Sequence, residues 1–207
     1  MKAKKLVKTK ISIKNNSEEV KNGFDKGIDF EETRKIFRLK IKELLKDLKG
    51  DYNVHKVKAL SNIVIALISL VNGSRISESI EAVFKFVDNK NLTKVLVPIA
   101  KRKDGEMRII LLPKEINREI LEYIQKFISG AEAHKLQSKV RTYLTDNYGF
   151  NTHSLRYAAI NYLITEQKQP LNVVSKLVGH KSMNMLINYT QNKNVSSTLE
   201  SMNSGKF

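Results

Sequence analysis

Residues Lys94 to Leu112 read KVLVPIAKRKDGEMRIILL, and this stretch decides the fold class. Two short segments within it, Lys94–Ile99 and Met107–Leu112, are rich in the β-branched and aliphatic residues that strands favour. The polar residues between them, Ala100 to Glu106, include Gly105 near the expected turn. We therefore predict an antiparallel β-hairpin.

A further strand is predicted just before the hairpin, at Val83–Val87, where the same residue types recur between polar segments. Pro113 follows the last strand, and a proline inside a sheet would remove a ladder hydrogen bond. We therefore expect one small, three-stranded antiparallel sheet that ends at this proline.

The chain before the sheet has helical periodicity. Asp29 followed by Glu32 resembles a helix-starting capping pair, and Gly50 supplies a stop. A second helix is predicted at Lys56–Val71. It is apolar nearly all round from Ile63 onward, which indicates a central, buried helix. A short helix carrying Ile76, Ile80 and Val83 is expected to follow.

After Pro113 the chain is helical in pattern almost to its end. The expected helices are Lys114–Ile128, Glu132–Tyr148, His153–Glu166, Leu171–Val178 and about Ser182–Thr190. The fold class is therefore mainly α with a small three-stranded antiparallel sheet (α+β). We divide the chain into a basic N-terminal arm and linker (1–28), one folded domain (29–190) and a polar C-terminal tail (191–207).

The composition points to a polyanionic partner. The 207 residues include 37 Lys+Arg and 21 Asp+Glu, which gives a net charge of +16, and 41% of residues are hydrophobic, enough for a core. Nucleic acid is the first candidate for the partner. The alternative is a lysine-rich solvated surface that binds nothing specific.

The lysines are densest at the N-terminus. The first fourteen residues contain no acid and six lysines, namely Lys2, Lys4, Lys5, Lys8, Lys10 and Lys14. Such a block repels itself until it meets counter-charge. It is either an arm that lies along a DNA backbone or a solubilising tail.

Several classes of protein are excluded. Cysteine is absent, which rules out disulfides, Cys-ligated metal sites and a cysteine nucleophile. The four histidines show no metal-ligand spacing, and no nucleotide-binding glycine loop is present, so we expect neither a metal nor a cofactor. The longest apolar stretch, Ile63–Val71, is too short to span a bilayer, and no secretion signal is evident. We expect a cytoplasmic, DNA-associated protein without a membrane partner.

A set of chemically capable residues stands out along the chain. Its members are Arg75, a hairpin lysine (Lys103 or Lys101), His153, Arg156, His180 and Tyr189. Taken singly, each has an ordinary structural explanation, such as an ion pair, a helix cap or a core aromatic. Their combination and order are far more specific than any one of them.

Together these residues resemble the tyrosine recombinase, or phage integrase-like, family. The motif of that family is Arg…Lys…His-x-x-Arg…Gly-His…Tyr, and every element occurs here in order. The resemblance covers roughly Asp29 to Gln191, and it implies that 29–190 is a catalytic domain. Two departures are the Tyr157 that replaces a common second His, and the absence of a preceding helical domain of about a hundred residues. The chain is then either a catalytic fragment or natural truncation, or its lysine arm replaces that domain's grip on DNA.

The resemblance implies a role for each residue. Arg75 and Arg156 would clamp the scissile phosphate, because the guanidinium fork matches phosphate oxygens. Tyr189 would be the nucleophile, His153 its proton acceptor, and His180 a hydrogen-bond donor to the phosphate. Glu78 would orient Arg75 or the hairpin lysine.

The hairpin lysine would protonate the leaving 5′-oxygen. Lys103 stands five residues before Arg108, which is the spacing the family often shows. Lys101 lies two residues earlier, on the expected same face of the strand, and stays the alternative.

The implied function is site-specific DNA recombination or integration through a covalent 3′-phosphotyrosine, without metal or ATP. Its expected partners are double-stranded DNA and other protomers, as a tetramer on DNA. The alternatives are a catalytically idle, regulatory DNA-binding protein on this fold, relaxation of DNA in the manner of type IB topoisomerases, and a generic basic nucleic-acid binder.

Overall fold

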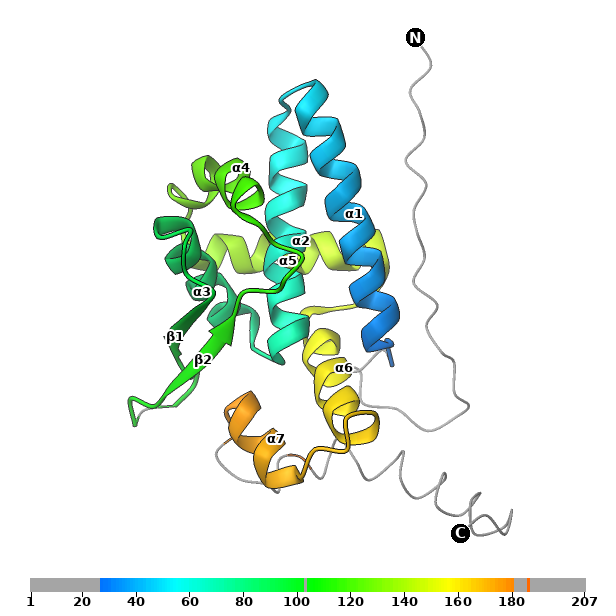
Figure 1. Ribbon diagram of the computed structural model, residues 1–207, viewed down its shortest axis with the longest axis vertical. Helices are drawn as coiled ribbons and strands as arrows, with labels where there is room; N and C mark the ends of the chain where they lie inside the picture. Colours follow the sequence, from blue (N-terminus) through cyan, green and yellow to red (C-terminus); the bar gives the residue numbers. More distant parts are fainter. Residues whose placement is uncertain (1–26, 103, 181–185, 187–207) are drawn as a thin grey trace, which may run out of the picture.

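The computed structural model describes residues 27–102, 104–180 and 186 of the chain. Seven helices and two strands follow one another in these residues (Figure 1). They are α1 (Phe30–Gly50), α2 (Val54–Asn72), α3 (Ile76–Asp88), β1 (Lys94–Pro98), β2 (Met107–Leu111), α4 (Arg118–Ile128), α5 (Ala133–Tyr148), α6 (Thr152–Thr165) and α7 (Leu171–Val178).

Helix α2 is the centre of the fold, as its sequence predicts. Every residue from Leu60 to Leu70 is buried, and the helix packs against α1, α3, α4, α5 and α6. Within the described part of the chain, α2 alone is long and apolar enough to cross a membrane. However, 67% of that apolar window is buried inside the protein. Its all-round hydrophobicity therefore matches a core position.

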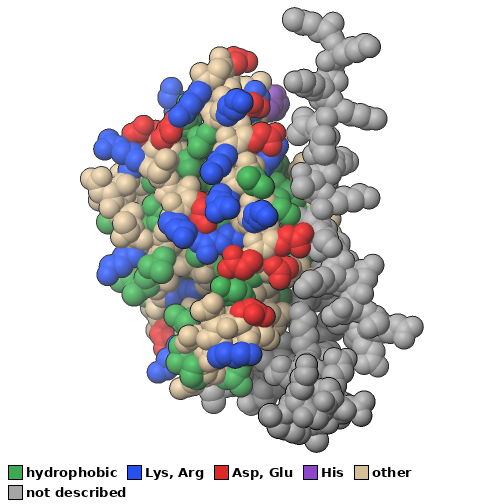
Figure 2. Space-filling model, turned by 45° about the vertical axis from the view of Figure 1, so that its right-hand side comes forward, with side chains coloured by type: hydrophobic (Ala, Val, Ile, Leu, Met, Phe, Trp, Pro, Cys, Tyr) green, Lys and Arg blue, Asp and Glu red, His purple; other side chains and the backbone are tan. Residues whose placement is uncertain are grey.

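Helix α1 is amphipathic and lies along α2 (Figure 1). The Asp29 carboxylate accepts a hydrogen bond of 2.8 Å from the Glu32 backbone N–H, so the predicted start of the helix is confirmed. Its apolar face packs into the core through Phe37, Ile41 and Leu44. Its outward face carries Lys and Arg side chains, visible as a band of blue atoms in Figure 2.

The predicted hairpin is confirmed, but the third strand is wrong. Strands β1 and β2 pair antiparallel in a two-stranded sheet, with Leu96 opposite Ile109. Residues Val83–Val87 instead belong to α3. The reason is that Ile76, Ile80, Val83 and Val87 recur at helical spacing, and all four are buried on one face.

The two faces of this sheet differ sharply. Inward positions of both strands are buried and outward positions are exposed. The outward positions of the sheet include four large apolar side chains, which are 45–55% exposed: Leu96, Met107, Ile109 and Leu111. On the inward side of β2, by contrast, Ile110 lies beside a buried arginine, Arg108.

Helices α4 to α7 complete the domain, and α4 begins later than predicted. Asn117 caps it by accepting a hydrogen bond of 3.0 Å from the Ile120 backbone N–H, so residues 114–117 precede the helix. Helix α7 packs on α6 in a small cluster of its own, made of Ile160, Val174, Val178 and Leu186. Leu186 is the one described residue of the predicted helix Ser182–Thr190, and it is helical and fully buried. The six N-terminal lysines and the tail 191–207 lie outside the described residues.

Candidate active site

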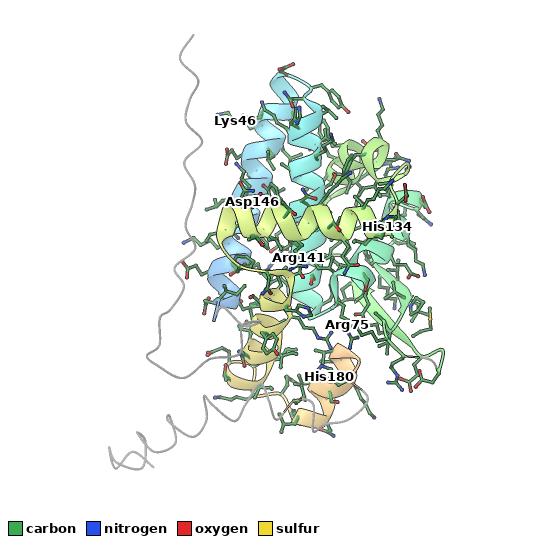
Figure 3. All side chains as sticks on the ribbon, turned by 180° about the vertical axis from the view of Figure 1, so that it is seen from behind. Lys46, Arg75, His134, Arg141, Asp146 and His180 are labelled. Carbon is green, nitrogen blue, oxygen red and sulfur yellow. The ribbon has the colours of Figure 1, made fainter. Side chains whose placement is uncertain are left out.

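The structure brings together residues that lie far apart in the sequence. Arg75 begins α3, His153 and Arg156 lie on the first two turns of α6, and His180 follows α7. The positive charges of Arg75 and Arg156 act on both imidazoles, which places the four side chains in one electrostatic neighbourhood. Figure 3 shows Arg75 and His180 next to each other between α3 and α7.

Glu78 is hydrogen-bonded to three residues around this group of side chains. Its carboxylate is fully buried and accepts hydrogen bonds from Arg75 through both the backbone N–H (3.1 Å) and the guanidinium (2.9 Å). It also accepts bonds from the Ala100 backbone N–H (3.0 Å) and the Arg108 guanidinium (3.1 Å). A buried carboxylate needs such partners to offset its desolvation. Glu78 therefore connects the start of α3 to the end of the hairpin.

Arg108 is a member of the site that sequence reasoning did not assign. Its guanidinium is buried and donates to the backbone oxygens of Asn72 (2.6 Å) and Val178 (3.2 Å) as well as to Glu78. Burial lowers its pKa to about 10, and the charge of Glu78 opposes that shift. The strand alternation could have revealed it, because Arg108 occupies an inward position beside Ile110.

Arg156 connects α6 to the turn that follows α2 and to the end of α7. It is 5% exposed and donates hydrogen bonds to the Gly73 oxygen (2.7 Å) and the Val178 oxygen (2.8 Å). Gly73 ends α2 at a φ of +56°, and a Cβ there would lie 3.1 Å from Val178 Cγ1. A left-handed φ and this close approach both favour glycine. The Gly73-Ser-Arg75 turn is thereby held against α7.

His153 is an exposed residue in the first turn of α6. Its backbone N–H donates 2.9 Å to the capping side chain of Asn151 at the start of α6. Partial burial of the imidazole lowers its pKa, and the charges of Lys101, Arg156 and Arg75 lower it further. The shift favours the neutral imidazole, which can accept a proton.

His180 is buried, and its pKa is lowered to about 4. Burial is the main cause, followed by the charges of Arg156, Arg75 and Arg108. Its backbone N–H donates 2.9 Å to the Ser175 oxygen. The imidazole is thus neutral throughout the physiological pH range.

Of the two candidate hairpin lysines, the structure describes Lys101. Lys101 is exposed, with a left-handed φ of +68°, and its charge reaches His153. Lys103 and Tyr189 lie outside the described residues. A second cation that sequence reasoning missed is Arg141 of α5, which also lowers the pKa of His153 (Figure 3).

The charge balance of the site favours an anionic ligand. In the described part of the chain it gathers five cations (Arg75, Lys101, Arg108, Arg141 and Arg156) and one carboxylate (Glu78). Among the described residues, no three His, Asp or Glu side chains lie close enough together to hold a metal ion. Guanidinium groups beside neutral imidazoles are suited to binding a phosphate.

Comparison with known proteins identifies relatives of the chain. The chain is 36% identical over 199 residues to "Putative integrase V10" of Sputnik virophage, and the match covers 84% of this chain and 88% of that protein. The chain belongs to an integrase-like family.

Two further proteins that resemble the chain come from an archaeon and an archaeal virus. "Uncharacterized protein MJ0770" of Methanocaldococcus jannaschii is 35% identical over 214 residues, or 91% of each chain. "Putative integrase ORF241" of Acidianus two-tailed virus is 29% identical over 174 residues, or 84% of this chain and 66% of that protein. No general model of a protein family matches the sequence. No solved structure matches it either.

Proposed function

We propose that this chain is a DNA integrase of the tyrosine recombinase type, which breaks and rejoins DNA through a covalent 3′-phosphotyrosine without metal or ATP. The observation that supports it best is that Arg75 and Arg156, from different helices, act on the same two histidines. The four described residues of the motif, Arg75, His153, Arg156 and His180, are therefore close in space, as a single active site requires.

In the proposed reaction, the two arginines hold the non-bridging oxygens of one backbone phosphate. Charge develops on these oxygens as the phosphorus becomes five-coordinate, and cationic donors fixed in advance stabilise it. Glu78 and the Gly73 and Val178 carbonyls keep the guanidinium groups in place. Such preorganisation contributes more than charge alone.

The nucleophile is Tyr189. Its phenol oxygen forms a bond to phosphorus while the bond from phosphorus to the 5′-oxygen breaks. The phenolic proton passes to His153, whose lowered pKa keeps it neutral and able to accept that proton. His180, also neutral, donates a hydrogen bond to the phosphate.

The leaving 5′-oxygen takes its proton from a hairpin lysine. The charge of Lys101 reaches His153, which favours Lys101, whereas the motif spacing favours Lys103. A 5′-phosphorothiolate substrate separates the two, because sulfur leaves without a proton. If the lysine that donates the proton is replaced by alanine (Lys101→Ala or Lys103→Ala), the variant will cleave normal DNA slowly and the phosphorothiolate substrate at a restored rate. The variant of the other lysine will cleave both substrates at similar rates.

The partners in this proposal are duplex DNA and further copies of the chain, four on a recombining pair of sites. Strand exchange needs such an assembly, whereas cleavage by one protomer does not. The experiment that tests the function therefore begins with cleavage.

The test mixes the full chain with end-labelled, nicked duplexes that carry a randomised central block. Release of the short fragment beyond the nick traps the covalent intermediate as an SDS-resistant complex. We expect this complex with the unchanged chain and with Tyr52→Phe, a control at a residue that is 58% exposed and lies in the loop between α1 and α2. We expect none with Tyr189→Phe, which should still shift the duplex in a native gel.

Other results of this test would indicate a different nucleophile or a different function. A covalent complex with Tyr189→Phe would show that another residue is the nucleophile. Binding without any covalent complex would indicate a regulatory DNA-binding protein. Relaxation of supercoiled plasmid without exchange between duplexes would indicate a topoisomerase-like enzyme.

A further inference from the structure

The outward face of α1 carries a row of cations that the active site does not use. Its members, here called the basic stripe, are Lys35, Arg38, Lys42, Lys46 and Lys49, and all are exposed. They are three or four residues apart, so they share one side of the helix. Figure 2 shows this face, with Lys and Arg atoms running down its middle.

The basic stripe has little counter-charge. Lys49 pairs with Glu119 at 2.9 Å, but the described residues provide no carboxylate within 4 Å of Lys35, Arg38, Lys42 or Lys46. Glu43 and Asp47 lie on another side of α1 and are paired elsewhere, with Lys40 and Lys56 respectively. Glu31, one turn before Lys35, is in line with the stripe but forms no ion pair within 4 Å with it. An ordinary solvated helix mixes the two signs of charge, because like charges at i,i+4 destabilise it. The stripe therefore has a stability cost that a bound anion would remove.

The dimensions of the stripe match a nucleic-acid backbone. Fourteen residues separate its ends, which is about 21 Å along the helix, with one cation per turn. Phosphates on one strand of duplex DNA advance about 3.4 Å each along the axis, so several lie within that length. One helix can thus face a run of phosphates.

Other polyanions fit this face less well. A helix that binds a lipid surface inserts an apolar face, but the apolar face of α1 is buried against α2. Single-stranded nucleic acid is bound by stacking on exposed aromatic rings, and both aromatic residues of α1, Phe30 and Phe37, are buried. Duplex phosphate contacts need neither feature.

The stripe is also separate from the active site. The site is built from α3, the hairpin, α6 and the end of α7, and no residue of α1 shifts the pKa of its histidines. Figure 3 places Lys46 on α1, well away from Arg75 and His180. We infer that the basic stripe of α1 is a second DNA-binding surface, which holds a duplex by its phosphates irrespective of sequence.

The test compares two triple variants of the full chain that lose the same charge. The stripe variant is Arg38→Gln, Lys42→Gln and Lys46→Gln. The matched control is Lys94→Gln, Lys126→Gln and Lys168→Gln, at three exposed lysines of separate elements. Both are titrated with a random-sequence duplex over a range of salt concentrations.

For the stripe variant we expect roughly tenfold or greater loss of affinity at low salt. The slope of log K against log salt should become shallower by about 2.7, at about 0.9 per lost phosphate contact. The control should keep the slope of the unchanged chain. The melting temperature of the stripe variant should not fall, since the change removes i,i+4 repulsion.

Two results would overturn the inference. One is an unchanged slope in a stripe variant that melts like the unchanged chain. The other is a loss of binding to anionic-lipid vesicles with no loss of binding to the duplex. The covalent-trapping assay is run at saturating DNA, where weaker binding does not limit cleavage. It therefore tests the proposed chemistry independently of the DNA affinity that tests the basic stripe.

Discussion

Arg108 of β2 and Arg156 of α6 donate hydrogen bonds to the same acceptor, the backbone oxygen of Val178, at 3.2 and 2.8 Å. This carbonyl ends α7, two residues before His180. The hairpin and α6 therefore determine together where that histidine lies. Arg108 also forms an ion pair with Glu78, so one buried guanidinium is bonded both to α3 and to the end of α7.

Arg108→Met should destabilise the protein by about 3 kcal/mol, because it leaves Glu78 buried with one cationic partner fewer. Urea denaturation measures this. The control is Arg118→Met, which removes an exposed pair with Glu122 and should cost no more than about 0.5 kcal/mol. Equal losses in the two variants would contradict a structural role for Arg108.

Gly179→Ala should destabilise more than Gly149→Ala. Both glycines end helices at positive φ, +69° and +78°, so both variants incur the left-handed penalty of about 1–2 kcal/mol. Only at Gly179 does a new Cβ meet a neighbour, Ile99 Cγ2 at 3.1 Å, whereas nothing lies within 4 Å at Gly149. The Ile99 Cδ1 would also lie 3.3 Å from that Cβ, so adding Ile99→Val, which removes Cδ1, should recover part of the difference. If the two alanine variants unfold at the same urea concentration, the contact with Ile99 is unimportant.

Arg75→Ala should slow covalent cleavage about 10²- to 10³-fold, by analogy with the loss of an oxyanion donor. Its effect on stability should be smaller than that of Arg108→Met, because Arg75 is partly exposed and Glu78 keeps Arg108. Single-turnover trapping on nicked duplex measures the rate, and urea denaturation measures the stability. Cleavage near the unchanged rate would remove Arg75 from the phosphate clamp.

The free energy of unfolding should fall as the pH is lowered from about 6.5 to about 4. The folded pKa of His180 is about 4, while the unfolded side chain takes up a proton near pH 6.5. In that window the unfolded state binds more protons, so acid favours it, by about 2 kcal/mol between pH 7.5 and 5. His153 acts in the same direction.

The variant His180→Asn isolates this contribution. Its stability should change less with pH over the same window, and the difference between the two curves reports His180 alone. Parallel curves for the two proteins would mean that His180 titrates in the folded state as it does in the unfolded chain.

The wrong third strand shows where local pattern is ambiguous. The residues Val83–Val87 read VFKFV, which alternates like a strand. The same residues also continue the helical spacing from Ile76 and Ile80, and burial of that longer stripe against the core decides the outcome. Period alone does not separate the two in so short a run.

Arg108 and Arg141 show what a motif leaves out. Neither belongs to the series of residues that resembles the recombinase family. Arg108 matters because β2 turns it inward to Glu78, and Arg141 because α5 brings its charge to His153. Both roles depend on which face of an element meets which neighbour.

The sequence alone determined most of the helices, the cap of α1 and the hairpin, since periodicity, capping residues and turns act over a few neighbouring positions. Through the ordered Arg, His and Tyr residues it also suggested the kind of chemistry that we propose. Only the tertiary structure decided that Arg75, Arg156 and His180 come together, because the packing of α3 and α6 on α2, and of α7 on α6, sets the distances between residues up to 105 positions apart. Hydrogen bonds to the backbone of Gly73 and Val178 then fix the arrangement, and no local pattern encodes them.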